Sequence, residues 1–318
     1  MDSTYVVGID VGGQTSKIGV VDARGTVLAQ TVIRTDTYDT IEPYIAELAE
    51  AVKKLVVESK TEGKIRGVGV GAPNGNYYTG TIENAPNLRW GRNKVEFAKL
   101  LSEAMNGLPV ALTNDANAAA VGEMTYGAAR GMKNFIMITL GTGVGSGIVI
   151  NGEVVYGHDG FAGELGHTAA VRTNGRACGC GKSGCLEAYT SATGVARTAR
   201  EWLELTDEPS VLRSLDTIAS KDVYDAAKDG DKLALKIFEF TGKILGRSFA
   251  DFVAFSAPEA IVLFGGLARA KEFLTEPIEN AMNDNLLPMW KGKVKIVYSQ
   301  LKESDAAILG ASALAWEL

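Results

Sequence analysis

The chain has 318 residues, of which 46% are apolar, and its 32 basic and 38 acidic side chains give a net charge of −6. Such a composition is typical of a globular protein, and the length predicts roughly two domains. The acidic balance and the absence of a basic cluster argue against a nucleic-acid-binding module. No apolar run reaches the roughly 18 residues that a membrane span needs, and the N-terminal residues do not resemble a secretory leader. We therefore expect a cytoplasmic protein.

The predicted elements alternate between strands and helices, which favours an α/β architecture. Apolar and β-branched runs predict strands at residues 5–9, 65–70, 110–112, 135–140, 261–264 and 294–298. Helical spacing and capping residues predict helices over residues 41–56, from Asn114-Asp115 to about Arg130, over 233–255, and from Ser304-Asp305 to Trp316.

Two parts of the chain resemble each other. Residues 6–28 and residues 136–155 each read as a strand, a glycine-rich turn, a second strand, a tight turn and a third strand. Two copies about 130 residues apart indicate a duplicated domain and not a solenoid, whose repeats are about 20 to 50 residues long. We expect two similar lobes that face each other.

The glycine-rich turns Gly12-Gly13 and Gly141-Thr142-Gly143 could bind phosphate. Glycine lets backbone N–H groups approach a phosphate closely, so two such turns could hold one polyphosphate from both sides. Taken alone, each is equally explained as an ordinary hairpin turn. A dinucleotide-binding fingerprint is disfavoured, because Ser146 stands at its last glycine position and a hairpin follows where a helix is required.

All three cysteines of the chain, Cys178, Cys180 and Cys185, fall within eight residues, with His167 upstream. An odd and tightly grouped set argues against a disulfide framework. Three thiolates and one imidazole are a sufficient tetrahedral zinc set with no open position, which predicts a structural zinc and not a hydrolytic centre. Three reduced thiols without a metal remain the alternative. If one His167 nitrogen binds the metal, the other is left to donate to a ligand.

Five motifs together resemble the ROK family of bacterial sugar kinases and repressors, and most closely its glucokinase-type members. They are Asp10-Val11-Gly12-Gly13, Asn114-Asp115-Ala116-Asn117, Gly141-Thr142-Gly143-Val144-Gly145, Gly163-Glu164-Leu165-Gly166-His167 and the cysteine segment 178–187. The resemblance implies the actin-like and hexokinase-like (ribonuclease H-like) fold: a duplicated, two-lobed α/β ATPase with an interlobe cleft. We expect residues 1–113, completed by a C-terminal helix at 305–318, to form the small lobe. Residues 114–304, with a zinc-binding loop at 167–185, would form the large one.

The resemblance implies that Asp115 is the catalytic base of an ATP-dependent hexose kinase. A positioned carboxylate can accept the proton of a sugar hydroxyl as the γ-phosphoryl group leaves ATP. We expect the helix that starts here to keep Asp115 ionised, so that it acts by orientation more than by basicity. Without the other motifs, Asp115 would be interpreted as a plain helix cap.

The resemblance also implies the ligand contacts. The sugar-binding residues are Asn87, Asn114, Asp115, Glu164, His167 and Glu187. The ATP-binding residues are Gly12, Gly13, Thr15, Lys17, Thr142, Gly143, Gly265 and Gly266. Asp10 is expected to hold Mg²⁺ through water. The chain departs from the family at Gln14, where a threonine usually follows the two glycines, which puts any role of that hydroxyl in doubt.

The leading hypothesis is a glucokinase that phosphorylates the sugar 6-hydroxyl as a step of glycolysis. Other hexoses are open alternatives, namely N-acetylmannosamine, N-acetylglucosamine, fructose and mannose. A ROK repressor is disfavoured, because the first strand begins by Tyr5 and leaves no room for a DNA-binding module before it. A non-catalytic sugar-binding protein is the third possibility. By family analogy we expect a homo-oligomer, a dimer or a tetramer.

Overall fold

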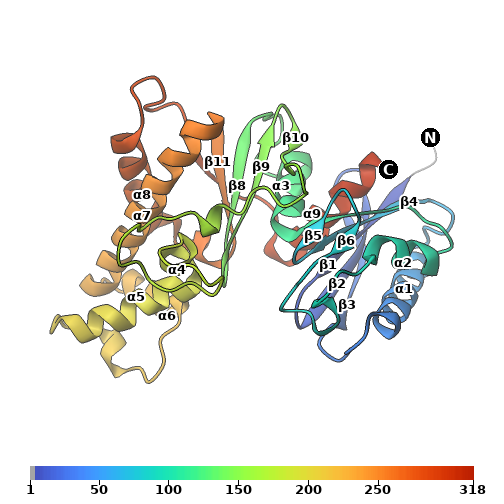
Figure 1. Ribbon diagram of the computed structural model, residues 1–318, viewed down its shortest axis with the longest axis horizontal. Helices are drawn as coiled ribbons and strands as arrows, with labels where there is room; N and C mark the ends of the chain where they lie inside the picture. The colour runs from blue at the N-terminus through green and yellow to red at the C-terminus, as the bar shows by residue number, and fades with distance from the viewer. Residues whose placement is uncertain (1–3) are drawn as a thin grey trace. The chain divides into compact units, whose positions relative to one another are not determined.

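A computed structural model describes residues 4–318 (Figure 1). The chain forms two compact units and passes between them more than once. The first unit comprises the residues up to Met132, Gly152–Gly163 and Gln300–Leu318. The second comprises Lys133–Asn151 and Glu164–Ser299.

The first unit is built on a five-stranded sheet of order β3-β2-β1-β4-β7. Its strands are β1 (Tyr5–Val11), β2 (Thr15–Asp22), β3 (Val27–Arg34), β4 (Ile65–Ala72) and β7 (Val110–Asn114). The strands β1, β2 and β3 form an antiparallel meander, whereas β4 and β7 run parallel to β1. A small hairpin, β5 (Gly75–Asn76) and β6 (Thr81–Ile82), follows β4.

Alternation along the strands separates the two faces of this sheet. On one face, Val7 and Ile9 form a core with the helices α1 (Ile41–Glu58) and α2 (Phe97–Ala104). The helix α9 (Glu303–Leu314) packs against the other face. On that face, a Cβ on Gly8 would lie 2.1 Å from the Ile308 carbonyl oxygen. Because Gly8 has no side chain, the backbone of α9 can lie directly on the sheet at this point.

The helix α3 (Asp115–Tyr126) also belongs to the first unit. It crosses α9 at two glycines, where a Cβ on Gly122 would lie 2.7 Å from the Gly310 Cα. The predicted boundary at residue 113 assigned this helix to the other lobe. The structure differs, because α3 packs against α9 and the compact unit therefore extends to Met132.

The second unit repeats the topology of the first. Its sheet has the order β10-β9-β8-β11-β12, with β9 antiparallel to β8, and β11 and β12 parallel to β8. The strands are β8 (Phe135–Leu140), β9 (Val144–Ile150), β11 (Ala260–Phe264) and β12 (Lys295–Tyr298), with the edge strand β10 (Glu153–Val154), whose residues are counted with the first unit. Positive φ angles at Asn151 and Gly152 form the tight turn before β10. The order matches β3-β2-β1-β4-β7 strand by strand, which confirms the predicted duplication.

Five α-helices of the second unit surround a large apolar core. They are α4 (Glu187–Thr190), α5 (Ala192–Leu205), α6 (Ser220–Lys228), α7 (Lys232–Ser256) and α8 (Lys271–Asn285). The short 3₁₀ helices of the chain are η1 (Arg89–Gly91), η2 (Leu165–His167), η3 (Val211–Ser214), η4 (Gly266–Ala270) and η5 (Ala315–Glu317).

The predicted strands and long helices are confirmed, with shifts at their ends. The helix predicted to reach Arg130 ends at Tyr126, before the chain turns at Gly127. The last α-helix begins at Glu303 and ends at Leu314, after which a 3₁₀ turn covers Trp316. The helices α2, α4, α5, α6 and α8 were not predicted.

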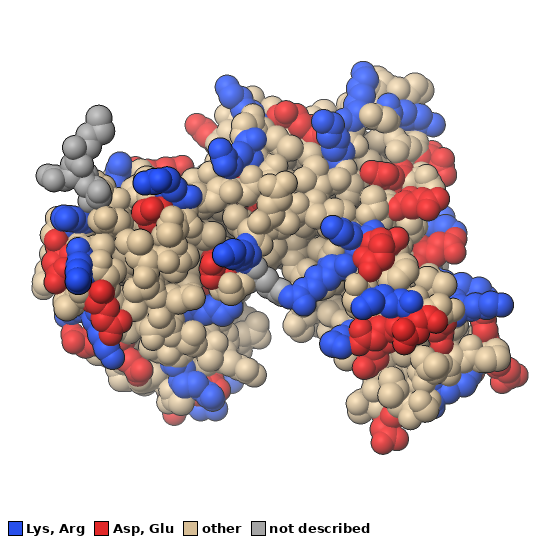
Figure 2. Space-filling model, turned by 180° about the vertical axis from the view of Figure 1, so that it is seen from behind, with Lys and Arg blue, Asp and Glu red and all other residues tan. Residues whose placement is uncertain are grey.

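No helix in residues 4–318 is long and apolar enough to cross a membrane. On the face drawn in Figure 2, basic and acidic side chains are interspersed, and no broad basic field is visible there.

Candidate active site

In the first unit, the predicted site residues Asp10, Asn114 and Asp115 lie at the carboxyl ends of the parallel strands. Asp10 near the end of β1 is in register with Gly71 of β4, and Ala72 is in register with Asn114 of β7. A Cβ on Gly71 would lie 3.6 Å from the Asp115 Cα. The carboxyl ends of neighbouring parallel strands are the usual ligand-binding edge of an α/β sheet.

Asn114 and Asp115 are held by the first turn of α3. The Asn114 Oδ1 accepts hydrogen bonds from the N–H groups of Ala116 at 2.8 Å and Asn117 at 3.3 Å, and so caps the helix. The Asp115 Oδ1 accepts from the same Ala116 N–H at 2.8 Å. Because the Asn114 oxygen is used by the cap, its Nδ2 is the group that can donate to a ligand.

The protein around Asp10 and Asp115 acts on the pKa of both carboxyls against the effect expected of the helix end. The protein that surrounds Asp115 raises the pKa of its carboxyl, although the side chain remains accessible to solvent, and the backbone N–H of Ala116 offsets only part of this rise. Burial also raises the pKa of Asp10 to about 6, with a further rise from the negative charge of Asp115 and an opposing effect of Lys17. Desolvation therefore outweighs the helix end.

Replacing Asp10 with asparagine is expected to raise the melting temperature more at pH 7.5 than at pH 4.5. A carboxyl with a raised folded-state pKa stabilises the fold only while it is protonated, so wild type loses stability as the pH rises from about 4 through about 6. Asparagine does not titrate and removes this loss. Thermal denaturation of both forms across this pH range tests the prediction, with Asp251→Asn on the exposed face of α7 as the control. An equal change at both pH values would contradict it.

The first glycine-rich turn joins β1 to β2. The Gly12 N–H donates to the Thr15 carbonyl at 3.0 Å, and the Gln14 carbonyl accepts from Thr35 at 2.8 Å. A Cβ on Gly13 would lie 2.9 Å from the Asn87 carbonyl, so the structure brings a predicted nucleotide residue against a predicted sugar residue. The Gln14 side chain is exposed.

A buried hydroxyl network supports this turn from below. The Ser16 Oγ lies 2.7 Å from both the Thr35 Oγ1 and the Tyr44 hydroxyl, and all three side chains are buried. Ser16 follows Thr15 directly and precedes Lys17, which is in register with Asp10. The network therefore fixes the start of β2, and with it the positions of Thr15 and Lys17.

In the second unit, the matching turn joins β8 to β9. The Gly141 N–H donates to the Gly143 carbonyl at 3.0 Å, two residues on, whereas Gly12 in the first unit donates to Thr15, three residues on. Gly265 adopts φ +102, and a Cβ there would lie 2.6 Å from the Leu140 carbonyl. The structure thus brings the predicted adenosine segment Gly265-Gly266 beside the predicted phosphate turn.

Glu187 lies between this turn and the cysteine segment. Its Oε2 accepts from the Val144 N–H at 2.9 Å, and its Oε1 lies 3.6 Å from the Cys178 Sγ. A cavity of about 240 Å³ borders these groups. Its lining includes Thr142, Cys178, Glu187, Thr193 and Arg197.

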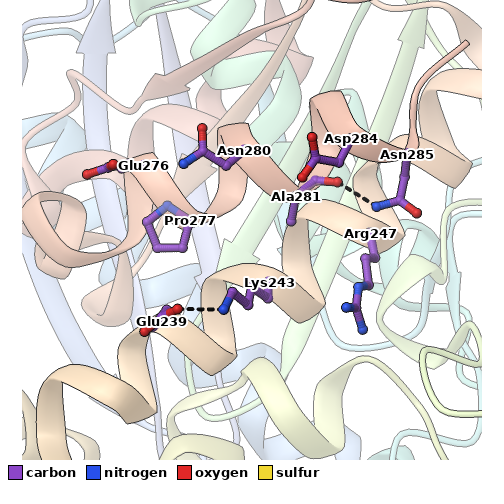
Figure 3. A pocket seen from close by; sticks show the side chains of 9 residues that line it. All are labelled: Glu239, Lys243, Arg247, Glu276, Pro277, Asn280, Ala281, Asp284 and Asn285. Carbon is purple, nitrogen blue, oxygen red and sulfur yellow. Dashed lines mark hydrogen bonds and ion pairs between the residues drawn. The ribbon is translucent and has the colours of Figure 1, made fainter.

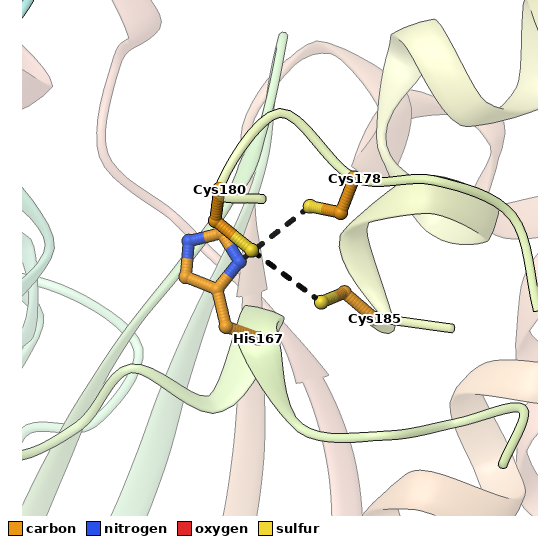
Figure 4. Close-up of side chains that lie close together, drawn as sticks. All are labelled: His167, Cys178, Cys180 and Cys185. Atoms are coloured by element: carbon orange, nitrogen blue, oxygen red, sulfur yellow. Dashed lines mark hydrogen bonds between the residues drawn. The ribbon is translucent and has the colours of Figure 1, made fainter. Parts of the chain in front are cut away.

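The predicted metal ligands converge (Figure 4). The ligand atoms of His167, Cys178, Cys180 and Cys185 all lie within 4.8 Å of one another, with 3.7 Å between the sulfurs of Cys180 and Cys185. Zinc–sulfur bonds of about 2.3 Å in a tetrahedron give sulfur–sulfur distances of about 3.8 Å. The donor set and its spacing therefore fit one Zn²⁺.

The two nitrogens of His167 have different neighbours. Its Nδ1 lies 3.8 Å from the Cys178 Sγ, on the side of the cysteines. Its Nε2 lies 4.0 Å from the Glu164 Oε2, and the Glu164 side chain is 56% exposed. The ring can therefore bind a metal through one nitrogen and a ligand through the other.

The cysteine segment is fastened to α5 by an arginine that the sequence analysis did not identify. Arg176 is 9% exposed, pairs with Glu201 at 2.5 Å and donates to Thr198 at 2.9 Å. Its guanidinium also lies 4.6 Å from the centre of the Tyr189 ring. Its place two residues before Cys178 is visible in the sequence. Its role is not, because its partners are 13 to 25 residues further along the chain.

A further cavity of about 410 Å³ lies between α7 and α8 (Figure 3). Its walls carry both charges, with Lys243 and Arg247 beside Glu239, Glu276 and Asp284. None of the predicted site residues lines it. This cavity is separate from the candidate site.

The duplicated sheets, with a glycine-rich turn in each unit and aspartates at the carboxyl ends of the strands, define the class of two-lobed proteins with the actin-like and hexokinase-like fold. A sequence model described as the ROK family matches residues 6–317, and the chain belongs to that family.

Three similar proteins agree with this assignment. A glucokinase of Halalkalibacterium halodurans is 37% identical, over 98% of this chain and 94% of that one. A glucokinase of Thermotoga maritima is 35% identical, over 99% and 98% of the two chains. The crystal structure of a ROK family glucokinase from Streptomyces griseus in complex with glucose and AMPPNP is 32% identical, with a TM-score of 0.79 over 99% of this chain and 100% of that one.

Proposed function

We propose that this protein is an ATP-dependent glucokinase, which transfers the γ-phosphoryl group of ATP to the 6-hydroxyl of glucose. The observation that carries the proposal is the position of Asp115, at the start of a capped helix and at the carboxyl end of the sheet, where its charge acts on Asp10. Full-length relatives named glucokinase support the choice of reaction and sugar.

In the proposed reaction, the Asp115 carboxylate accepts the proton of the sugar 6-hydroxyl. The hydroxyl oxygen forms a bond to the γ-phosphorus while the bond from that phosphorus to the bridging oxygen breaks, and ADP leaves. The raised pKa of Asp115 makes it a better base than an ordinary aspartate, and its hydrogen bond from Ala116 holds it in one orientation.

The remaining sugar contacts are proposed from the chemistry of their side chains. Asn87 and Asn114 offer amides, Glu164 and Glu187 offer carboxylates, and His167 offers its Nε2. A sugar needs several converging partners, and hydroxyls without partners at such a site are strongly disfavoured. The second oxygen of Glu187 already accepts from Val144, which leaves Oε1 as its more available acceptor.

The proposed nucleotide contacts come from both turns. Gly12, Gly13, Thr15 and Lys17 would bind phosphate from the first unit, Thr142 and Gly143 from the second, and Gly265-Gly266 would bind the adenosine. Mg²⁺, held through water by Asp10, would neutralise charge on the phosphates. Gln14, with its exposed side chain, replaces the usual threonine without disturbing the backbone bond from Gly12 to Thr15.

The cysteine cluster is proposed to bind one structural zinc. Three sulfurs and the Nδ1 of His167 fill a tetrahedral shell, so no position remains for a reacting water. Zinc would fix the ring of His167 and, through Cys178, the segment beside Glu187.

The family resemblance also extends the proposal to a cytoplasmic enzyme of glycolysis and to a homo-oligomer, a dimer or a tetramer. Size-exclusion chromatography with light scattering measures the oligomeric state. A monomer at micromolar concentration would contradict that part of the proposal and leave the reaction untouched.

A coupled assay of ADP formation with Mg²⁺ and ATP tests the proposed function. Glucose, fructose, mannose, N-acetylglucosamine and N-acetylmannosamine are compared, and the phosphorylated position is read by NMR. We expect the highest kcat/KM with glucose and phosphorylation at the 6-position. A higher value with another sugar would make the protein a kinase of that hexose. Binding of sugar without turnover of any of them would exclude a kinase.

A further inference from the structure

The segment that leads to Glu164 is fastened to the first unit by residues outside every predicted site. Residues 152–163 belong to the first unit, and Glu164 is the residue that follows. The fastening residues lie in the hairpin after β4, at positions 76–78. A sugar contact is only as well placed as the chain that carries it.

Asn76 is the central fastening residue. Its side chain is 3% exposed, and its Nδ2 donates to the Asp159 carbonyl at 2.7 Å. Its Oδ1 accepts from the N–H of Tyr78 at 3.1 Å and lies 3.4 Å from that of Thr79. The oxygen of Asn76 thus serves its own hairpin, whereas the nitrogen reaches across 83 residues to the segment before Glu164.

Two tyrosines of the hairpin add to this attachment. The Tyr78 hydroxyl donates to the Gly157 carbonyl at 2.9 Å, although the residue is 59% exposed. Tyr77 stacks on Tyr156, with ring centres 4.1 Å apart and planes within 2° of parallel. Two hydrogen bonds and one stacked pair therefore hold residues 156–159 at three positions, Tyr156, Gly157 and Asp159.

The backbone of residues 156–163 allows this close contact with Asn76. Gly160 adopts φ +91, and a Cβ there would lie 2.5 Å from the Asn76 Oδ1, so a side chain would displace Asn76. The Ala162 N–H donates back to the Tyr156 carbonyl at 3.0 Å, which closes residues 156–162 into a loop. Gly163, with φ +101, then connects this loop to Glu164.

We propose that Asn76 and Tyr78 form a clasp that positions Glu164 for the sugar. The clasp holds the carbonyls of Asp159 and Gly157 in place. Because residues 156–162 form a closed loop, the whole loop is held with them. Glu164 is the second residue after this loop, so its position depends on the clasp. Asn76 and Tyr78 are positioning residues and contact neither substrate. The inference rests on the proposed function, because it assigns Glu164 to the sugar and not to ATP.

Two substitutions separate the clasp from the stability of the hairpin. Asn76→Asp keeps an oxygen for the N–H groups of Tyr78 and Thr79 but places a second oxygen against the Asp159 carbonyl. Tyr78→Phe removes one hydrogen bond from an exposed side chain and leaves the ring in place. The matched control for the first is Asn283→Asp at the end of α8, which keeps an oxygen for the Gly292 N–H but places a second oxygen against the Glu279 carbonyl. The control for the second is Tyr224→Phe on α6, which removes the hydrogen bond from the Tyr224 hydroxyl to Glu272.

The test compares KM for glucose, KM for ATP, kcat and the melting temperature of these variants. One lost hydrogen bond corresponds to about a twofold to tenfold weaker interaction. We expect KM for glucose to rise about threefold in Tyr78→Phe and about tenfold or more in Asn76→Asp, with KM for ATP within about twofold of wild type. Hydrogen exchange of residues 156–163 is expected to become faster in both.

The outcomes separate the two proposals. A wild-type enzyme that phosphorylates glucose, with Tyr78→Phe and Asn76→Asp kinetically equal to the controls, would overturn the clasp alone. A parallel rise of both KM values would also overturn it, because it would show a general loss of structure. A wild-type protein inactive toward all five sugars would overturn the proposed function and the clasp with it. If Asn76→Asp fails to fold, Tyr78→Phe decides.

Discussion

Asp115→Asn is expected to lower kcat by a factor of about 10² to 10⁴, the range that positioned general bases contribute. The amide keeps the shape of the carboxylate and can still accept the Ala116 N–H, so α3 should start unchanged. Without the Asp115 carboxylate, the attacking hydroxyl loses the proton acceptor that the proposed reaction assigns to it. The affinity for glucose and for a non-hydrolysable ATP analogue, measured by calorimetry, should remain within a few-fold of wild type.

The matched control is Asp251→Asn, which removes a carboxylate from an exposed position on α7. It is expected to leave kcat unchanged. A kcat of Asp115→Asn close to that of wild type would remove Asp115 from the role of base. A loss of binding equal to the loss of kcat would instead mean that Asp115 only holds the sugar.

Cys180→Ala is expected to abolish stoichiometric zinc binding, since one of four ligands is lost. It is also expected to raise KM for glucose by about tenfold or more, because loss of even a residue that only contacts a metal ligand lowers metal affinity or activity by about 10- to 100-fold. Cys180 is the exposed member of the cluster, so its substitution leaves the buried Cys185 packed. The loss of metal should loosen His167 and the contact between Cys178 and Glu187. Elemental analysis and glucose kinetics measure the two effects.

Ser183→Ala lies in the same loop and carries no metal ligand, so it is expected to keep both zinc and KM. Incubation of the wild-type enzyme with a chelator should reproduce the Cys180→Ala phenotype, and added zinc should reverse it. One zinc per chain in Cys180→Ala would refute the ligand set. Loss of zinc without any change in KM would show that the metal does not support sugar binding.

The parts of the site that could be predicted are those whose information is local in the sequence. The metal ligands lie close together along the chain, and Asn114-Asp115 is a helix start that the structure retains. The repeated turns allowed the duplicated sheets to be predicted, because strand, turn and strand are adjacent in each copy.

What could not be predicted depends on contacts between distant residues. The clasp joins Asn76 to Asp159, and nothing in either neighbourhood marks an asparagine that donates across the fold. The helix α3 was assigned to the wrong lobe because its partner glycine is at position 310. The helix end that favours the ionised form of Asp115 is visible in the sequence, whereas the surrounding protein that raises its pKa is not.

The glycine contacts between α9 and the first sheet have a consequence for synthesis of the chain. Gly8 and Gly69 are each covered by backbone of α9, at Ile308 and Ala311. The strands β1 and β4 are synthesised early, but one apolar face of their sheet stays exposed until α9 has been translated. A nascent chain that stalls before residue 300 would expose that face, which makes it a natural target for chaperones and proteases.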